Sequence, residues 1–227
     1  MTRIIAALAA LPLVATALPA SAQDPGDHTP ADHGAMATAE GMPDGWRMRF
    51  DRSGAGPDMV DFRVMEPGWH MTTGRAGAGI YWQPDMTAAG EYSVRTTIHL
   101  FDPASHAEAF GLFIGGTALD AEDQSYVYFL VRQTGEYLVK RRAGAETANV
   151  VGWTGHEAVP EATPGEEGST QYDLEVRVGG DAVDFLVQGE VVHSLPRSEV
   201  ATEGIVGLRI NHMLDVHVQE LELEQAG

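Results

Sequence analysis

The chain has 227 residues, a formal net charge of −19 and no cysteine. The missing thiols exclude disulfides, thiolate metal sites and a cysteine nucleophile. The strongly negative charge argues against nucleic acid or an anionic lipid surface as a partner. Because the chain has no disulfides, its stability must come from a packed core, for which this length is sufficient.

The first 22 residues have the pattern of a secretory signal peptide. Arg3 supplies a positive start, Ile4 to Leu18 are apolar, and Ala20-Ser21-Ala22 fits the small-x-small cleavage rule. An uncleaved membrane anchor is the alternative, but the apolar run is shorter than the ~20 residues that span a bilayer. We expect cleavage before Gln23, no membrane span after it, and a periplasmic or extracellular product.

Residues 23–44 are rich in Pro, Gly, Ala, Asp and His and show no apolar periodicity, which predicts a flexible N-terminal segment. The pattern then changes to short alternations of apolar and polar residues, over 94–100, 174–178 and 183–187. A period of two is typical of half-buried strands. The remainder, 45–227, is therefore expected to form one β-sandwich domain.

Several local signals refine this expectation. Gly179-Gly180 and Gln188-Gly189 are typical of tight hairpin turns, because glycine accepts the positive φ that such turns require. The run 126–131 (YVYFLV) is apolar on both faces, which indicates either a central strand covered on both sides or a strand with one face lining an aromatic groove. The stretch 104–110 is the one helical candidate.

The last strand predicts an irregularity. Leu214, Val216 and Val218 have the opposite parity to Leu221 and Leu223, so a β-bulge near Gln219-Glu220 would let both sets reach the core. In all, about a dozen short strands separated by Gly, Pro and Asp predict an all-β, two-sheet antiparallel sandwich.

Several stretches also resemble one superfamily: GWHMTTG (68–74), GIYWQP (79–84), EYSVRTTIHLF (91–101), GLFIGG (111–116), YVYFLVRQTGEYLVKRR (126–142) and FLVQGEVV (185–192). Their order is similar to that in concanavalin A-like lectin/glucanase domains, in particular laminin-G-like and family-16-glycosidase-like exported bacterial proteins. The resemblance spans about 45–225. It implies a jelly roll with one concave sheet, on which members of the superfamily often bind or cleave carbohydrate.

The catalytic candidates are Glu220 and Glu222. Residues i and i+2 share a strand face about 7 Å apart, and glycosidases use two carboxyl groups roughly 5–9.5 Å apart. The run from Glu220 to Glu224 also resembles the Glu-x-Asp-x-Glu motif of family 16, with Glu222 in the place of the Asp. The alternative is the solvated face of a terminal strand.

The ligand-binding candidates are aromatic residues on neighbouring predicted strands, together with one arginine. Sugar rings stack on aromatic faces, and a guanidinium donates hydrogen bonds to hydroxyls or carboxylates. The alternatives are ordinary core packing for the aromatic residues and cross-strand ion pairing for the arginine. The candidates are Trp82, Tyr126, Tyr128, Arg132 and Tyr137.

Metal candidates are fewer. The acidic loop with Asp120 and Asp123 could supply oxygen ligands to calcium, although a hydrated turn is the alternative. His212 could share a metal with His217 only if the chain turns between them, because residues five apart face opposite sides of a strand. We expect no other cofactor.

The function expected from these patterns is an exported, non-catalytic domain that binds carbohydrate or a glycan-bearing surface. A periplasmic glycoside hydrolase or lyase is the second hypothesis, since it follows from the resemblance and from Glu220 and Glu222. An envelope structural or interaction protein is the third, in which the aromatic residues would be wholly buried. The sequence leaves the ligand and the oligomeric state open.

Overall fold

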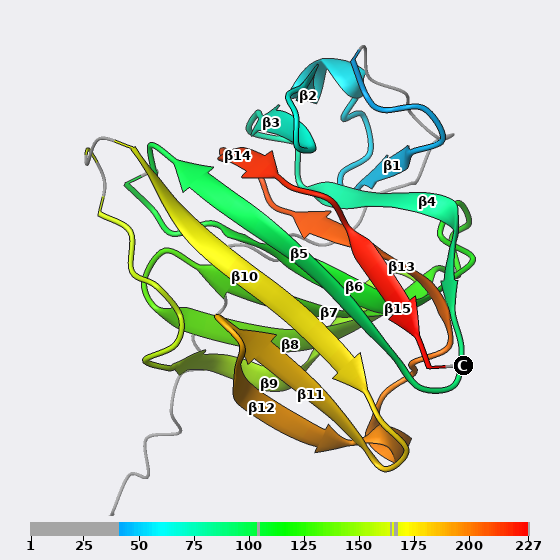
Figure 1. The fold of residues 1–227 in the computed structure, drawn as a ribbon. Coiled ribbons are helices and arrows are strands. Elements are labelled where there is room, and N and C mark those ends of the chain that lie inside the picture. The colour runs from blue at the N-terminus through cyan, green and yellow to red at the C-terminus, as the bar shows by residue number, and fades with distance from the viewer. Residues whose placement is uncertain (1–40, 104, 164, 166–167, 227) are drawn as a thin grey trace, which may run out of the picture.

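The computed structural model describes residues 41–103, 105–163, 165 and 168–226. Within them the chain is built of strands in two antiparallel sheets, plus two short 3-10 turns, η1 (Pro57–Met59) and η2 (Arg197–Glu199). Figure 1 shows β10, β5 and β15 crossing in front of β6, β7 and β8, so the two sheets form a sandwich. The predicted all-β, two-sheet fold is confirmed.

The first sheet has seven strands. Four of them, β6 to β9, follow one another in the chain and pair in that order. From edge to edge its strands are β1 (Arg47–Phe50), β4 (Gly79–Ala88), β13 (Gly204–Ile210), β6 (Ala109–Thr117), β7 (Ser125–Arg132), β8 (Glu136–Ala143) and β9 (Glu146–Gly155).

The second sheet has eight strands. The order along its main path is β12 (Glu190–Pro196), β11 (Ala182–Val187), β10 (Ser169–Val178), β5 (Tyr92–Phe101), β14 (Asp215–Val218), β3 (Trp69–Thr73) and β2 (Val60–Val64), and β15 (Glu222–Gln225) also pairs with β5. β5 is long enough to pair with β14 at one end and β15 at the other.

Apolar alternation places the main core between the sheets. On β5, Val94, Ile98 and Leu100 are buried, whereas Arg95 between them is exposed. Rings from opposite sheets meet there. The centroids of Phe129 and Phe185 lie 5.2 Å apart.

The central strands of the seven-stranded sheet carry buried residues on their outer face as well. A second apolar cluster contains Trp82, Phe113, Tyr126 and Tyr128. Its described members come from strands of this sheet and from Leu119 in the loop between β6 and β7. β7 lies between β6 and β8, and its six central residues are all buried. This double burial explains why its sequence is apolar at successive positions.

Two predicted backbone features are present. Gln188 and Gly189 both have positive φ, 52° and 76°, and Val187 pairs with Glu190 across them, as a two-residue hairpin requires. At the C-terminus, Val218 pairs with Ile98 and Glu222 with Arg95. Four steps along one strand therefore match three along its partner, which is the expected bulge.

The remaining structural predictions concern a helix at 104–110 and the N-terminal residues. The helical expectation for 104–110 is wrong for the described residues, because Ala109 and Phe110 begin β6 and pair with β7. The signal peptide and most of the 23–44 segment lie outside the described residues. Among the described residues, no helix has the length and apolar character needed to cross a membrane.

The contact between Phe129 and Phe185 gives a direct test of the core. Phe129→Ala should lower the free energy of unfolding by about 3–5 kcal/mol, since it removes a buried ring and leaves a cavity between the sheets. Denaturant unfolding measures the change. Val64→Ala is the control, because Val64 is 63% exposed and should cost less than about 0.5 kcal/mol. Similar effects for both variants would contradict the packing described.

Candidate functional site

Four of the five predicted ligand-binding residues lie on one surface, the outer face of the seven-stranded sheet. Tyr126 pairs with Arg142, Tyr128 with Lys140, and Arg132 with Glu136, so all of these share a side of β7 and β8. Trp82 on β4 belongs to the same apolar cluster as Tyr126 and Tyr128. We call this surface the arginine–aromatic face. It comprises Arg49, Trp82, Tyr126, Tyr128, Arg132, Lys140, Arg142, Trp153 and Arg209.

Tyr137 lies on the opposite side of its strand, in the main core. It is 3% exposed, its ring neighbours Phe129, and its hydroxyl lies 3.3 Å from Nδ1 of His193. Burial raises the pKa of this hydroxyl, with a hydrogen bond from Thr154 opposing the shift. Tyr137 therefore does not share a surface with the other four candidates.

The aromatic rings at the centre of the face are buried and are not exposed to solvent. Trp82 and Tyr126 are each 1% exposed, and Tyr128 is 4% exposed. The ring centroids of Tyr126 and Phe113 are 5.3 Å apart, and those of Tyr126 and Tyr128 are 5.6 Å apart. These three side chains are therefore packed as ordinary buried aromatic residues are. Their role in ligand binding stays a prediction.

A charged network crosses the same face. Asp51, directly after β1, accepts hydrogen bonds from Arg209 at 2.8 Å and Arg142 at 3.3 Å. Burial by itself would lower the pKa of Arg209, but the attraction of Asp51 and of the neighbouring Tyr126 outweighs it and raises that pKa. The Arg209 guanidinium also lies 5.7 Å from the ring centre of Tyr128.

The network leaves donors unpaired. Nε of Arg142, Nε of Arg209, and Nε and Nη2 of Arg49 are buried and have no hydrogen-bond acceptor among the described residues. A buried donor without a partner costs about 1–3 kcal/mol. These N–H groups are covered by the surrounding side chains, so they are not accessible to a ligand in this conformation.

The accessible part of the face is at the end of β7 and β8. Arg132 is 23% exposed and its guanidinium carbon lies 4.1 Å from the ring centre of the half-buried Trp153. Glu136 Oε2 accepts from Nε of Arg132 at 2.8 Å and from Oγ1 of Thr134 at 2.6 Å. The hydrogen bonds described for Glu136 all end on Oε2, which leaves Oε1 for another donor.

Glu136 was not a sequence candidate, although a signal existed. The turn Gln133-Thr134-Gly135 between two apolar runs predicts a hairpin, and a hairpin places Arg132 directly opposite Glu136. Asp51 gave no such signal, because its partners are distant in the sequence.

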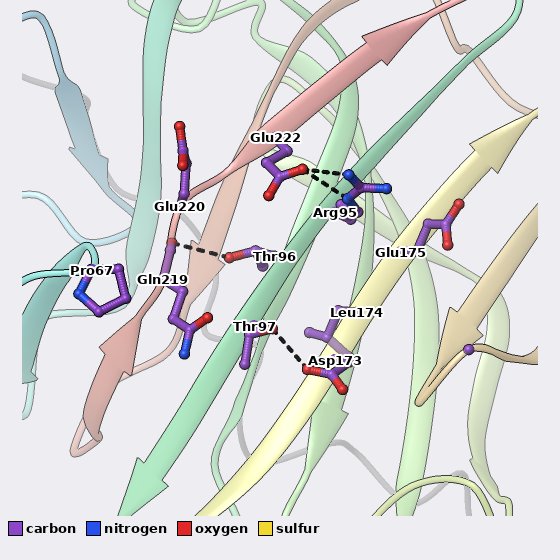
Figure 2. Close-up of a pocket in the computed structure, with 11 residues that line it drawn as sticks. Pro67, Arg95, Thr96, Thr97, Asp173, Leu174, Glu175, Gln219, Glu220 and Glu222 are labelled. Atoms are coloured by element: carbon purple, nitrogen blue, oxygen red, sulfur yellow. Dashed lines mark hydrogen bonds and ion pairs between the residues drawn. The ribbon is translucent and has the colours of Figure 1, made fainter.

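A separate groove of about 500 Å³ lies on the outer face of the eight-stranded sheet. Figure 2 shows the residues that line it, most of which come from β5, β10 and the C-terminal segment from Gln219 to Glu222. The groove is polar: Thr97 donates to Asp173 at 2.7 Å, and Arg95 donates to Glu222 at 2.9 and 2.6 Å.

Both catalytic candidates line this groove. Figure 2 shows Glu222 turned toward Arg95 and Glu220 turned away from it. Glu220 lies in the bulge between β14 and β15, so the spacing of a regular strand does not apply to the pair. The geometry gives Glu222 an arginine partner, and catalysis by these residues stays a prediction.

The acidic loop places its oxygen atoms against arginines. Asp120 pairs with Arg47 at 3.0 Å, and Arg49 donates to the carbonyl oxygens of Leu119 and Ala121 at 2.8 and 2.6 Å. Asp123 belongs to no group of three metal-ligating side chains among the described residues. Arginine side chains therefore already pair with Asp120 and with two carbonyl oxygens of the loop, and calcium binding there stays a prediction.

His212 is separated from its expected partner. His217 lies on β14, where its ring neighbours those of His70 and His99, with centroids 6.3 and 6.1 Å away. His212 follows β13 and approaches Glu108 and His106 instead. The predicted pair therefore does not converge, whereas a different histidine does meet His212.

No protein-family model matches the chain, and no curated protein sequence matches it. Solved structures do match. The carbohydrate-binding module CBM66 from Bacillus subtilis aligns with a TM-score of 0.56 at 12% identity, covering 83% of this chain and 99% of that one. A protein of unknown function with a galectin-like fold, also from Bacillus subtilis, aligns with a TM-score of 0.57 at 11% identity, covering 86% and 97%.

The carbohydrate recognition domain of Emp46p in its metal-free form aligns with a TM-score of 0.52 at 10% identity, covering 79% of this chain and 88% of that one. What these proteins share with the chain is the fold. It is the jelly roll of galectin-like and CBM66 domains, consistent with the resemblance to the concanavalin A-like superfamily. At such low identity the likeness assigns no ligand.

The Asp51 network can be tested by substitution. Asp51→Asn keeps the size of the side chain but leaves Arg209, 4% exposed, without its counter-charge. Removing one partner of a buried pair should lower the free energy of unfolding by about 3–5 kcal/mol. Asp61→Asn is the control, since Asp61 pairs with Arg63 at the surface and should change stability by less than about 1 kcal/mol. Equal changes would contradict the proposed role of Asp51.

Proposed function

We propose that this chain is an exported, non-catalytic carbohydrate-binding domain whose glycan binds at Arg132, Glu136 and Trp153. The observation that carries the proposal is the arginine stacked 4.1 Å from the indole and fixed by a carboxylate, at the accessible end of the arginine–aromatic face. The fold shared with carbohydrate-binding modules and galectin-like domains supports it. Export rests on the signal-peptide pattern of residues 1–22.

The chemistry of the three side chains suits a sugar. An indole offers an apolar surface to the C–H face of a pyranose or furanose ring, and in Trp153 this would be the ring face that Arg132 does not cover. Arg132 can donate to hydroxyl oxygens, and Oε1 of Glu136 can accept from a hydroxyl.

The charge of the chain favours neutral glycans. A net charge of −19 repels polyanionic polysaccharides at long range. Hydroxyl groups carry no such penalty, because they pair with arginine and carboxylate side chains as neutral donors and acceptors. We therefore propose neutral oligosaccharides as the ligand class.

Carbohydrate binding without hydrolysis has more support than glycoside hydrolysis. A glycosidase needs two carboxyl groups flanking the scissile bond. Glu222 is held by Arg95 in the groove of Figure 2, where Glu220 points elsewhere.

The proposal is tested by glycan-array screening followed by calorimetric titration with the best neutral oligosaccharide. Trp153→Ala and Arg132→Ala should each weaken binding at least about tenfold, a loss of about 1.4 kcal/mol, because one removes the stacking surface and the other the donors. Arg177→Ala is the matched control, since Arg177 makes a similar arginine–carboxylate pair with Glu175 on the other sheet. It should bind as the unsubstituted chain does.

Three results would count against the proposal. Silence across a broad neutral panel would remove carbohydrate as the ligand. Unchanged affinity in both Trp153→Ala and Arg132→Ala would move the site elsewhere. Release of new reducing ends from a bound oligosaccharide would contradict the non-catalytic assignment.

A further inference from the structure

Three metal-ligating side chains meet at one end of the seven-stranded sheet. His106 and Glu108 lie in the segment that leads into β6, and His212 follows β13. β6 and β13 pair directly, and the amide of Asn211 donates to the carbonyl of Ala109 at 3.0 Å. This pairing fixes the two segments side by side, so residues far apart in the sequence converge.

The donor atoms are spaced as a metal ion requires. Oε1 of Glu108 lies 3.2 Å from Nε2 of His212 and 3.4 Å from Nε2 of His106. The three side chains each offer a ligand atom within 4.8 Å of the others. Metal–ligand bonds of about 2.0–2.2 Å at tetrahedral angles separate donor atoms by roughly 3.4 Å. An ion can therefore reach all three with small side-chain adjustments.

Burial adds an electrostatic reason. Glu108 is 5% exposed, and a desolvated carboxylate is costly unless a positive charge is close to it. The His212 side chain is 16% exposed and that of His106 is 56% exposed, so the cluster opens to solvent on the His106 side. A cation held there would be attracted by the Glu108 carboxylate and would have open coordination positions for water on the His106 side.

We propose that His106, Glu108 and His212 bind a divalent transition-metal ion, of the class represented by Zn²⁺. Two imidazole nitrogens and one carboxylate oxygen suit zinc and its neighbours in the first row, whereas calcium and magnesium prefer oxygen ligands throughout. Three protein ligands leave a position open for water or another small ligand. The site is distinct from the three glycan-binding side chains and does not depend on their function.

Zinc binding is measured by calorimetry on the mature chain, free of any affinity tag and stripped with a chelator. The unsubstituted protein should bind one Zn²⁺ at this site, and His106→Ala, Glu108→Gln and His212→Ala should each weaken that binding at least about tenfold. Co²⁺ gives a second readout, since its visible absorption bands report nitrogen and oxygen ligands. Those bands should be present in the unsubstituted protein and absent from Glu108→Gln.

His156→Ala is the matched control. His156 lies 3.9 Å from Glu190, one imidazole near one carboxylate, and the pair belongs to no group of three among the described residues. This variant should bind Zn²⁺ unchanged. His106→Ala keeps the test valid if the buried substitutions disturb folding, because the His106 side chain is largely exposed. Absence of zinc binding by the unsubstituted chain, or binding that survives His106→Ala, would overturn the proposal.

Discussion

Asp51 holds the arginine–aromatic face together. Its carboxylate pairs with Arg209 on β13 and Arg142 on β8, two strands separated in the sheet by β6 and β7. The two long side chains converge on one carboxylate above the intervening strands, where aromatic rings fill the remaining space. Because a buried guanidinium without a counter-charge is costly, this pairing constrains the positions of β1, β8 and β13 together.

The outer faces of the two sheets have different chemistry. On the eight-stranded sheet, exposed ion pairs such as Arg95 with Glu222 and Arg177 with Glu175 form a polar surface. On the seven-stranded sheet, cations lie among aromatic rings and are largely buried. An acidic chain thus concentrates several of its few cations on one face, and the accessible end of that face carries Arg132 and Trp153.

The glycan-binding and metal-binding proposals concern the same end of the molecule. Ala109 pairs with Arg132 in the register of β6 and β7, so Glu108 precedes the residue that faces Arg132. The pairing of β6 with β13 brings His212 to this end as well. Register between strands distant in the sequence therefore assembles the metal cluster, whereas Arg132 and Glu136 meet across a short hairpin.

Local signals in the sequence predicted local structure well. Alternation on β5, the Gln188-Gly189 hairpin and the C-terminal bulge all follow from the two-residue period and from the φ that glycine accepts. The same period failed for Tyr137, because it is the first of three successive apolar residues in β8, which give no indication of which side faces the core.

Long-range pairing was beyond reach from one sequence. His212 has His217 near it in the chain, yet its partners are His106 and Glu108, which the sheet topology brings close. Asp51 looked like an ordinary loop residue for the same reason. Stretch 104–110 contains small and polar residues that helices also accept, and pairing with β7 decided in favour of a strand at Ala109.

A glycan bound at the accessible end of the arginine–aromatic face would contact Trp153. The chain has four tryptophans, and the indole N–H signal of each can be followed by NMR during titration with a neutral oligosaccharide that binds. We expect the Trp153 signal to move, while those of Trp46 and Trp69, buried in the main core, stay in place. If the Trp153 signal stays in place while other signals in the spectrum shift, the glycan does not bind at this end of the face.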